Sequence, residues 1–435
     1  MKREALVFPS GFLWGSAASA HQTEGGNRND WSEWERIPGK IRDGTNSSRS
    51  CDHYNRYEED FDLAKEYGHQ VHRFSVEWSR IEPTRGAWNE REVEHYRRVV
   101  KALVDRGIKP MVTLHHFTNP IWFRDIGAWL NPESPDIFAP YCRKVAESLC
   151  EFDIIWNTIN EPMIVSVAGY LFGEFPPGLK DFNKAMTVAS NLLMAHGRAA
   201  EQIRRVYKDN GLKQPQIAPV LSVSYFMPEN PDSEEDVELA NYLDNLYNHR
   251  WISGAIRGEV PSDDGGSIRY PALDNSVDFI GLNYYSRMVV SSRLDFMKGE
   301  MPPKDPSRPR CDGLDWEFYP EGYFPVIESF WSRYRKPIFL TENGIGTTDD
   351  ELRCRYIVQH LREVHRAISA GVDIRGYLVW SLTDNFEWAQ GFSSRFGLIE
   401  VDYETLERRP RQSAKMFREI IQSNSIPPSL LSRYG

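Results

Sequence analysis

The feature that most constrains the fold is a repeated order of elements: a short apolar strand, a polar segment and then a helical segment. Residues 54–67 illustrate the helical part, because apolar and aromatic side chains recur four and three positions apart until Gly68 ends the pattern. The predicted strands lie in residues 12–17, 71–80, 110–114, 154–161, 217–222, 277–285, 338–344 and 374–380. The predicted helices lie in residues 54–67, 90–105, 134–152, 185–207, 234–256, 350–369 and 413–421.

This alternation predicts an α/β fold, a single (β/α)8 TIM barrel domain over residues 1–435 with long βα loops at the carboxyl ends of the strands. An open doubly wound sheet would also bind ligands at its strand ends, so polar strand ends alone do not separate the two folds. Residues 291–322 are irregular and rich in proline and charge. We expect them to form a loop over the barrel mouth, because about thirty residues cannot bury a core of their own.

Polar residues gather at the carboxyl ends of the predicted strands, where barrels of this kind build their sites. Two of these ends carry a glutamate, Glu161 before Pro162 and Glu342 before Asn343-Gly344, and only folding can bring these side chains together across 181 residues of chain. The other polar or aromatic residues at or near strand ends are Arg73, His116, Asn160, Asn283, Tyr285 and Trp380.

A pair of carboxyl groups facing one pocket suits cleavage of a glycosidic bond. The reaction passes through an oxocarbenium-like state, which needs a carboxylate below the anomeric carbon and a proton donor at the leaving oxygen. Carboxyl groups about 5 Å apart give retention of configuration, whereas a gap of about 6.5–9.5 Å admits a water and gives inversion. The spacing in the chain leaves both outcomes open.

The net charge of the chain limits the classes of binding partner that it suits. A net charge of −10 and a pI near 5.7 argue against nucleic acid and against an anionic membrane, and a neutral small molecule fits better. Residues 12–20 imitate a secretory signal, but the apolar part is too short and Trp14-Gly15 interrupts it. Five cysteines show no disulfide spacing, so we expect reduced thiols and a cytoplasmic location. The sequence gives no indication of the oligomeric state.

No metal or cofactor is expected. Neighbouring His115 and His116 lie in no H-E-x-x-H arrangement and have no clustered cysteine. Gly344-Ile345-Gly346 lacks the third glycine of a dinucleotide-binding loop. The tight basic cluster Arg408-Arg409-Pro410-Arg411 is interpreted as a solvated turn before the last helix.

Several short motifs that occur in a fixed order along the chain indicate a family. They are Phe12-Leu13-Trp14-Gly15 with Gln22, Arg73-Phe74-Ser75, Thr158-Ile159-Asn160-Glu161-Pro162, Asn283-Tyr284-Tyr285, Thr341-Glu342-Asn343-Gly344, Trp380-Ser381-Leu382, Asp384-Asn385-Phe386-Glu387-Trp388 and Arg395-Phe396-Gly397. With these motifs the chain resembles glycoside hydrolase family 1, the β-glucosidase and β-galactosidase family, over nearly its whole length.

The resemblance implies roles for individual residues. Glu161 would be the acid/base and Glu342 the nucleophile of a retaining reaction, with Arg73, Asn283 and Tyr285 beside them. A cation and a phenol next to Glu342 would favour its charged form, while burial near that charge would raise the pKa of Glu161. The residues implied to hold the substrate are Gln22, His116, Asn160, Trp316, Trp380, Glu387, Trp388 and Phe396.

Two departures from the family pattern concern the pocket walls. Many members have His-Trp-Asp where this chain has His116-Phe117-Thr118, and many have an aromatic residue where this chain has Met163. A flexible thioether suggests a less selective site for the leaving group, the aglycone.

The resulting hypothesis is a cofactor-free, retaining, exo-acting β-glucosidase whose substrate is a small β-glycoside or a short β-linked oligosaccharide. A β-galactosidase, a β-fucosidase or a transglycosylase of the same family is the alternative among enzymes. A sugar-binding barrel without turnover is the alternative outside them.

Overall fold

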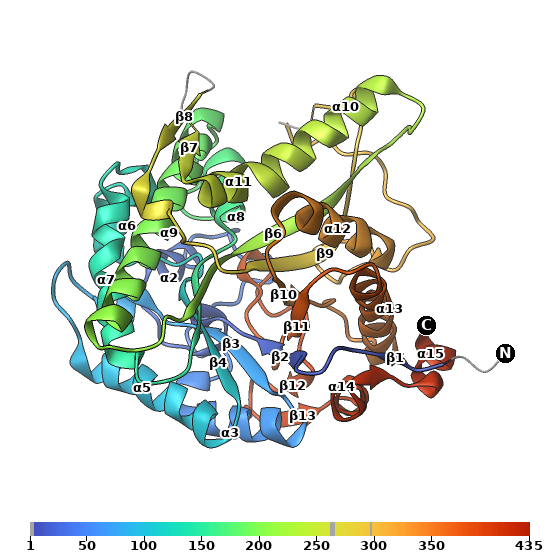
Figure 1. Cartoon of the computed structure of the whole chain (residues 1–435), viewed down its shortest axis with the longest axis horizontal. Coiled ribbons are helices and arrows are strands. Elements are labelled where there is room, and N and C mark those ends of the chain that lie inside the picture. Colours follow the sequence, from blue (N-terminus) through green and yellow to red (C-terminus); the bar gives the residue numbers. More distant parts are fainter. Residues whose placement is uncertain (1–3, 262–265, 296–297) are drawn as a thin grey trace.

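The computed structural model describes residues 4–261, 266–295 and 298–435, and its centre is a closed barrel of eight parallel strands (Figure 1). Around the barrel the strands follow the chain order, and the last pairs with the first to close it. Their bounds are β2 Leu13–Ala17, β3 Val71–Ser75, β4 Lys109–His115, β5 Ile155–Asn160, β6 Gln216–Pro228, β9 Ile280–Val290, β10 Ile338–Asn343 and β11 Ile374–Trp380. The predicted (β/α)8 barrel is confirmed, and the open sheet is wrong.

The predicted helices are present on the outside of the barrel. They are α3 His53–Glu66, α5 Glu90–Asp105, α7 Ser134–Leu149, α9 Phe182–Asp209, α13 Asp350–Ser369 and α14 Gln412–Ser423. The helix predicted at 234–256 is divided into α10 Glu234–Leu243 and α11 Arg250–Arg257 by a π-helical segment, η3 Asp244–His249. The sequence analysis missed α12 Tyr323–Tyr334, which connects β9 to β10.

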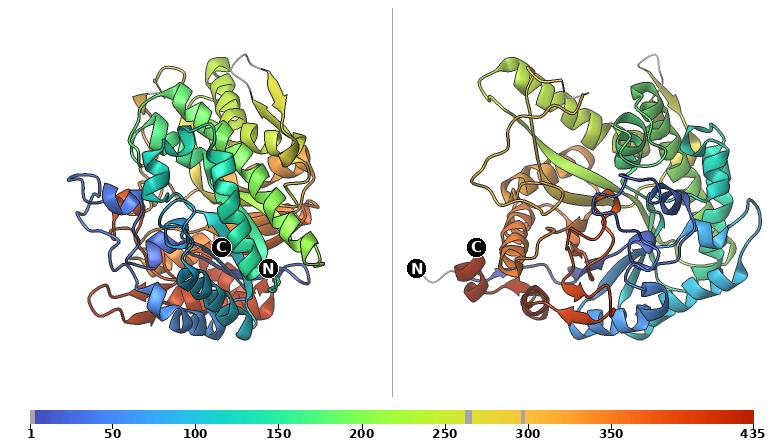
Figure 2. Two further views of the ribbon diagram at one scale, coloured as in Figure 1. Left: turned by 90° about the vertical axis from the view of Figure 1, so that its left-hand side faces the viewer. Right: turned by 180° about the vertical axis from the view of Figure 1, so that it is seen from behind.

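Shorter elements complete the chain. The short helices are α1 Ala20–Thr23, α2 Asp30–Trp34, α4 Trp78–Ile81, α6 Ile121–Asp125, α8 Pro162–Ser166 and α15 Pro428–Tyr434. The 3-10 turns are η1 Ala128–Leu130, η4 Pro271–Leu273, η6 Pro320–Gly322 and η7 Trp388–Gln390, and η2 Val167–Leu171 is a π-helical segment. The short strands are β1 Leu6–Val7, β7 Glu259–Pro261, β8 Ser267–Arg269, β12 Ile399–Val401, β13 Arg408–Pro410 and β14 Ser425–Ile426. The strand β1 pairs antiparallel with β14, so the two terminal segments lie side by side (Figure 2).

The barrel interior is a packed core and not a pore. Val71, Met111, Ile155, Phe339 and Leu378 come from five different strands and form part of one buried cluster. This arrangement matches the filled interior expected of an eight-stranded barrel. The open end above this core is therefore the place where strand-end side chains can form a site.

Two strands continue beyond the barrel. The pairing of β6 with β9 runs on to Pro228 and Val290, past the predicted ends at 222 and 285, and α10 packs beside this extension (Figure 1). The described residues of the predicted loop at 291–322 form short turns and one isolated antiparallel bridge, between Arg310 and Glu317. Residues 296 and 297 lie outside the described residues. Both segments contribute residues to the lining of the cavity at the barrel mouth.

Within the ranges that the structure describes, no helix is both long and apolar enough to cross a lipid bilayer.

Candidate active site

A cavity of about 880 Å³ lies at the carboxyl ends of the barrel strands. Six of the predicted site residues that line it are Gln22, His116, Asn160, Glu161, Tyr285 and Trp316. The remaining five are Glu342, Trp380, Glu387, Trp388 and Phe396. The two predicted residues that do not line it, Arg73 and Asn283, are fully buried behind the two glutamates and bind them. Folding thus brings all the predicted residues to one place.

The carboxyl group of Glu342 is bound on both oxygens. It lies near the end of β10, where Arg73 from β3 donates to Oε1 and the Tyr285 hydroxyl from β9 donates to Oε2 at 2.6 Å. The Arg73 guanidinium is itself oriented by Thr113 of β4, whose Oγ1 accepts from Nε at 3.0 Å. These contacts fix the carboxylate and favour its charged form.

Glu161 follows β5 and begins a turn. Its φ of 48° lies in the left-handed region, which is uncommon for a residue other than glycine, and Pro162 starts α8 directly after it. The Asn283 amide donates to Glu161 Oε1 at 2.7 Å, and Thr341 of β10 donates to Asn283 Oδ1 at 2.7 Å. Thr341, which precedes Glu342 on β10, therefore orients the Asn283 amide, and Asn283 in turn holds Glu161.

The electrostatic environment separates the two glutamates. Burial, followed by the charge of Glu342, raises the pKa of Glu161 to about 8. Burial also raises the pKa of Glu342, and Arg73 and Tyr285 oppose that rise. The predicted effect of these neighbours is present, but burial outweighs it. Because only Glu342 has a cation against its carboxylate, it gives up its proton more readily than Glu161.

The residues predicted to hold the substrate form a connected polar and aromatic group. Gln22 of α1 donates to Glu387 Oε2 at 3.2 Å, and Asn160 Nδ2 donates to His116 at 3.2 Å. The His116 ring stacks against Trp380, with centroids 6.1 Å apart. Burial lowers the pKa of His116, so its ring is neutral and can both donate and accept hydrogen bonds. Amides, an imidazole and an indole together suit a sugar ring with several hydroxyls.

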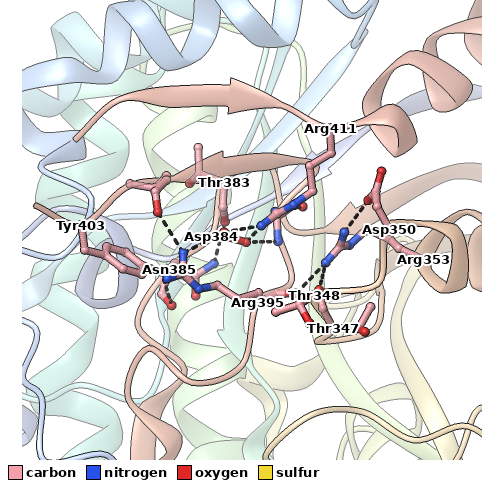
Figure 3. Close-up of polar contacts among 12 residues, drawn as sticks. Thr347, Thr348, Asp350, Arg353, Thr383, Asp384, Asn385, Arg395, Tyr403 and Arg411 are labelled. Carbon is pink, nitrogen blue, oxygen red and sulfur yellow. Dashed lines mark hydrogen bonds and ion pairs between the residues drawn. The ribbon is translucent and has the colours of Figure 1, made fainter. Parts of the chain in front are cut away.

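An ion network holds the loop that carries Glu387 and Trp388 (Figure 3). Asp384 is fully buried and accepts from Arg411 through both oxygens at 2.8 Å, from Arg395 at 3.1 Å and from the Gly397 amide at 2.9 Å. This carboxylate joins the loop after β11 to the segment that leads into α14. Each oxygen has a cationic partner, which is the arrangement a buried charge requires.

The interpretation of residues 408–411 as a solvated turn is wrong. Arg411 binds Asp384, and Arg408 is buried against Asp60 with Nε 2.9 Å from Oδ1. Among these arginines only Arg409 is exposed. Composition could not reveal this difference, because the acidic partners come from elements distant in the chain.

Replacing Asp384 with alanine should lower the free energy of unfolding by about 3–5 kcal/mol, because two guanidinium groups would lose their partner. Since the loop positions Glu387, which lines the cavity, KM for the substrate should rise as well. Urea denaturation and steady-state kinetics would check both effects. The matched control is Glu407→Ala, which removes an exposed carboxylate beside exposed Arg409 and should leave stability nearly unchanged. Equal stability of the two variants would contradict the assigned role.

The sequence analysis missed one side of the cavity. Phe226, Leu246, Tyr247 and Met288 line it, and they come from the extensions of β6 and β9 and from η3. The Tyr247 hydroxyl donates to Ser222 at 3.0 Å. A continuing alternation of apolar residues beyond residue 222 was the available signal, but the predicted strand ended there.

Across residues 4–261, 266–295 and 298–435, no group of three or more His, Cys, Asp and Glu side chains is arranged to hold a metal ion.

Comparison with known proteins identifies the family. The model of glycosyl hydrolase family 1 matches residues 4–426. The chain belongs to this family. As a family 1 member it is a glycoside hydrolase.

The relatives match nearly the whole chain. Beta-glucosidase A of Acetivibrio thermocellus is 33% identical over 449 residues, covering 96% of this chain and 99% of that protein. A beta-galactosidase of Sulfolobus acidocaldarius is 32% identical, covering 98% and 97%. Among solved structures, a beta-glycosidase from Pyrococcus horikoshii has a TM-score of 0.90 and 40% identity, covering 99% and 98%. The beta-glucosidase of Thermotoga maritima in complex with glucoimidazole has a TM-score of 0.88 and 32% identity, covering 96% and 99%.

Proposed function

We propose that this family 1 enzyme is a retaining, exo-acting β-glucosidase that removes terminal β-D-glucosyl residues from small β-glycosides or short β-linked oligosaccharides. The observation that carries the proposal is the pair of buried carboxyl groups in one cavity, with a cation on Glu342 and a neutral amide on Glu161. Relatives named beta-glucosidase, one of which binds glucoimidazole, support the choice of glucose.

The first half of the reaction uses the two groups in different protonation states. Glu342, ionised, attacks the anomeric carbon, and Glu161, protonated, gives its proton to the leaving oxygen. A covalent glycosyl-enzyme forms and the aglycone leaves. Arg73 and Tyr285 hold the attacking carboxylate in position, so little reorientation is needed as the bond forms.

The second half reverses the role of Glu161. Once Glu342 is esterified its charge is gone, and the pKa of Glu161 falls because the repulsion from Glu342, which added to the effect of burial, has been removed. Glu161 then acts as a base on water, and attack of this water from the side of the departed aglycone restores the original anomer.

The other predicted residues hold the sugar. Gln22, His116, Asn160 and Glu387 satisfy hydroxyl groups, and Trp380 covers the apolar face of the ring. Trp316 contacts the Tyr285 ring, with centroids 5.0 Å apart, and forms a wall on the aglycone side. The Phe396 ring packs edge-on against Tyr285, with centroids 6.2 Å apart. Trp388 packs beside His116.

The test is a panel of nitrophenyl glucoside, galactoside, fucoside and mannoside, with kcat/KM measured for each and the first anomer of the product read by NMR. The proposal expects glucoside to be preferred and the β-anomer to appear first. Preference for galactoside would favour the β-galactosidase alternative, which the relative from Sulfolobus acidocaldarius supports. Appearance of the α-anomer first would refute retention, and product analysis at high acceptor concentration would detect transglycosylation.

Replacing Arg73 with methionine should shift the acidic limb of the kcat/KM profile to higher pH by about 1–3 units, because the cation that favours ionised Glu342 would be lost. Glu342 must be charged to attack, so activity would disappear at a higher pH as the pH falls. Arg73→Lys, which keeps the charge, is the control and should shift the limb less. An unchanged limb in the methionine variant would contradict this assignment.

A further inference from the structure

His21 is buried beside the residues that are proposed to hold the sugar. It precedes Gln22 on α1, its side chain is inaccessible to solvent, and it does not line the cavity. Its ring lies against the Trp388 ring, with centroids 5.5 Å apart and planes 9° apart. Trp388 does line the cavity, so a residue outside the cavity supports one that faces the substrate.

The backbone of Trp388 makes this support necessary. Its φ of 49° lies in the left-handed region, which is uncommon for a residue other than glycine and persists only where the surroundings enforce it. The packing that enforces it consists of His21 together with the rings of Trp31 and Phe117, whose centroids lie 4.8 and 5.0 Å from that of Trp388. Glu387 directly precedes Trp388, so a change in this packing would displace both side chains.

Two hydrogen bonds determine which nitrogen of the His21 ring carries the proton. Asn29 Oδ1 accepts from the Ser32 amide at 2.8 Å, so the Asn29 Nδ2 group faces His21 and donates to its Nδ1 at 3.1 Å. Nδ1 is therefore the acceptor, and Nε2 carries the proton that is donated to Glu35 Oε1 at 2.7 Å. This is the pattern of a neutral imidazole, and a partner on each nitrogen sets the plane of the ring.

Glu35 accepts hydrogen bonds on both of its carboxyl oxygens. Oε1 accepts from His21, and Oε2 accepts from the Ser47 amide at 2.7 Å and from the Ser47 hydroxyl at 3.1 Å. Burial acts to raise the pKa of Glu35, but the hydrogen bonds from His21 and Ser47 hold it below its ordinary value. An amide at this position would turn its N–H groups toward one of these donors, so only a carboxylate satisfies both partners.

We propose that His21, oriented by Glu35, is a positioning residue for the sugar site and holds Trp388 and Glu387 where they meet the hydroxyl groups of the substrate. The inference rests on the proposed β-glucosidase activity. Neither His21 nor Glu35 lines the cavity, so both act through Trp388 and not on the substrate itself. Because the two catalytic glutamates are held by other partners, their chemistry should remain when sugar binding weakens.

The first variant is Glu35→Gln. Its kcat/KM for nitrophenyl β-glucoside should fall about tenfold, mainly through a higher KM, because the His21 ring would lose the acceptor that orients it. The matched control is Glu33→Gln, which removes a carboxylate of α2 that is 39% exposed and pairs with Arg124, and it should keep wild-type kinetics. Covalent trapping with a 2-deoxy-2-fluoroglucoside counts the active sites, so that kcat refers to folded enzyme.

Glucosides that lack one hydroxyl group separate positioning from a general loss of stability. In the wild type, removing a hydroxyl that Glu387 or Trp388 contacts should lower kcat/KM. If these side chains are displaced in Glu35→Gln, the same hydroxyl contributes less. The ratio of kcat/KM for nitrophenyl β-glucoside to that for its most affected 3-, 4- or 6-deoxy analogue should therefore fall at least about threefold. Reduced stability alone would leave this ratio unchanged.

A second variant tests the ring itself. His21→Gln keeps a hydrogen-bond donor for Glu35 but removes the ring from Trp388, and it should show the same rise in KM and the same fall in the deoxy ratio. A wild-type KM and ratio in either folded variant would overturn the positioning role while glucosidase activity remained. Absence of any nitrophenyl β-glucoside hydrolysis by the wild type would instead overturn the proposed function.

Discussion

Replacing Glu342 with alanine is expected to reduce kcat for nitrophenyl β-glucoside at least about a thousandfold, because no other side chain could form the covalent bond to the sugar. The variant should still fold, since removal of one carboxylate leaves Arg73 with its bond to Asn160 Oδ1 at 2.6 Å and to Thr113. Steady-state kinetics and a circular dichroism spectrum would check the two statements.

A small anion should restore part of this activity. Azide can enter the space vacated by the Glu342 side chain and attack the anomeric carbon in its place, and the product would be the α-glucosyl azide with inverted configuration. Glu351→Ala, which removes an exposed carboxylate on α13, is the control and should have wild-type kinetics. Wild-type turnover in Glu342→Ala would remove the basis of the proposed mechanism.

The barrel was predictable because its signal is local. Each strand is a short apolar run and each helix has its own periodicity, so residues 350–369 could be assigned as a helix with the same bounds that α13 has. The strand ends were predictable for the same reason. Glu161 and Glu342 stand at the ends of segments that begin as apolar runs and turn polar, and in a barrel the carboxyl ends of all strands meet at one edge.

What the sequence did not yield depends on contacts between distant segments. Arg411 and Arg408 resemble solvated residues until their partners, Asp384 and Asp60, are brought to them by the fold. The direction in which the pKa of Glu342 shifts is another such case. Its neighbours were predicted, but burial of the carboxyl group by the whole mouth of the barrel was not, and burial is the larger effect.

The side of the cavity that Leu246 and Tyr247 line was missed because it is built from irregular geometry. The π-helical segment η3 interrupts what the residue pattern predicts as one helix from 234 to 256, and this interruption carries Leu246 and Tyr247 to the cavity. Single π-helical turns often occur at functional sites, but periodicity alone does not indicate where they form. Only Met163 was recognised from the sequence as a determinant of this side.

The last expected result concerns Glu161. Replacing it with glutamine should lower kcat/KM for octyl glucoside about 10²–10⁴-fold, because an alkoxide leaves poorly without a proton. For dinitrophenyl glucoside, whose phenolate leaves readily, kcat/KM should change little, while kcat should fall because no base activates water in the second step. Kinetics with both substrates would measure this difference. Equal losses for the two leaving groups would mean that Glu161 is not the proton donor.

The pH dependence gives an independent check on the same group. Glu161 must hold its proton for the first step, so in the wild-type enzyme kcat/KM should fall as the pH rises through its raised pKa of about 8. Glutamine has no proton to lose, so this alkaline limb should be absent for dinitrophenyl glucoside in Glu161→Gln. Burial and the charge of Glu342 raise the pKa of Glu387 to about 8 as well, which makes Glu387→Gln the necessary control. The limb should persist in that control, because the proton given to the leaving oxygen comes from Glu161, and its loss there would transfer the assignment to Glu387.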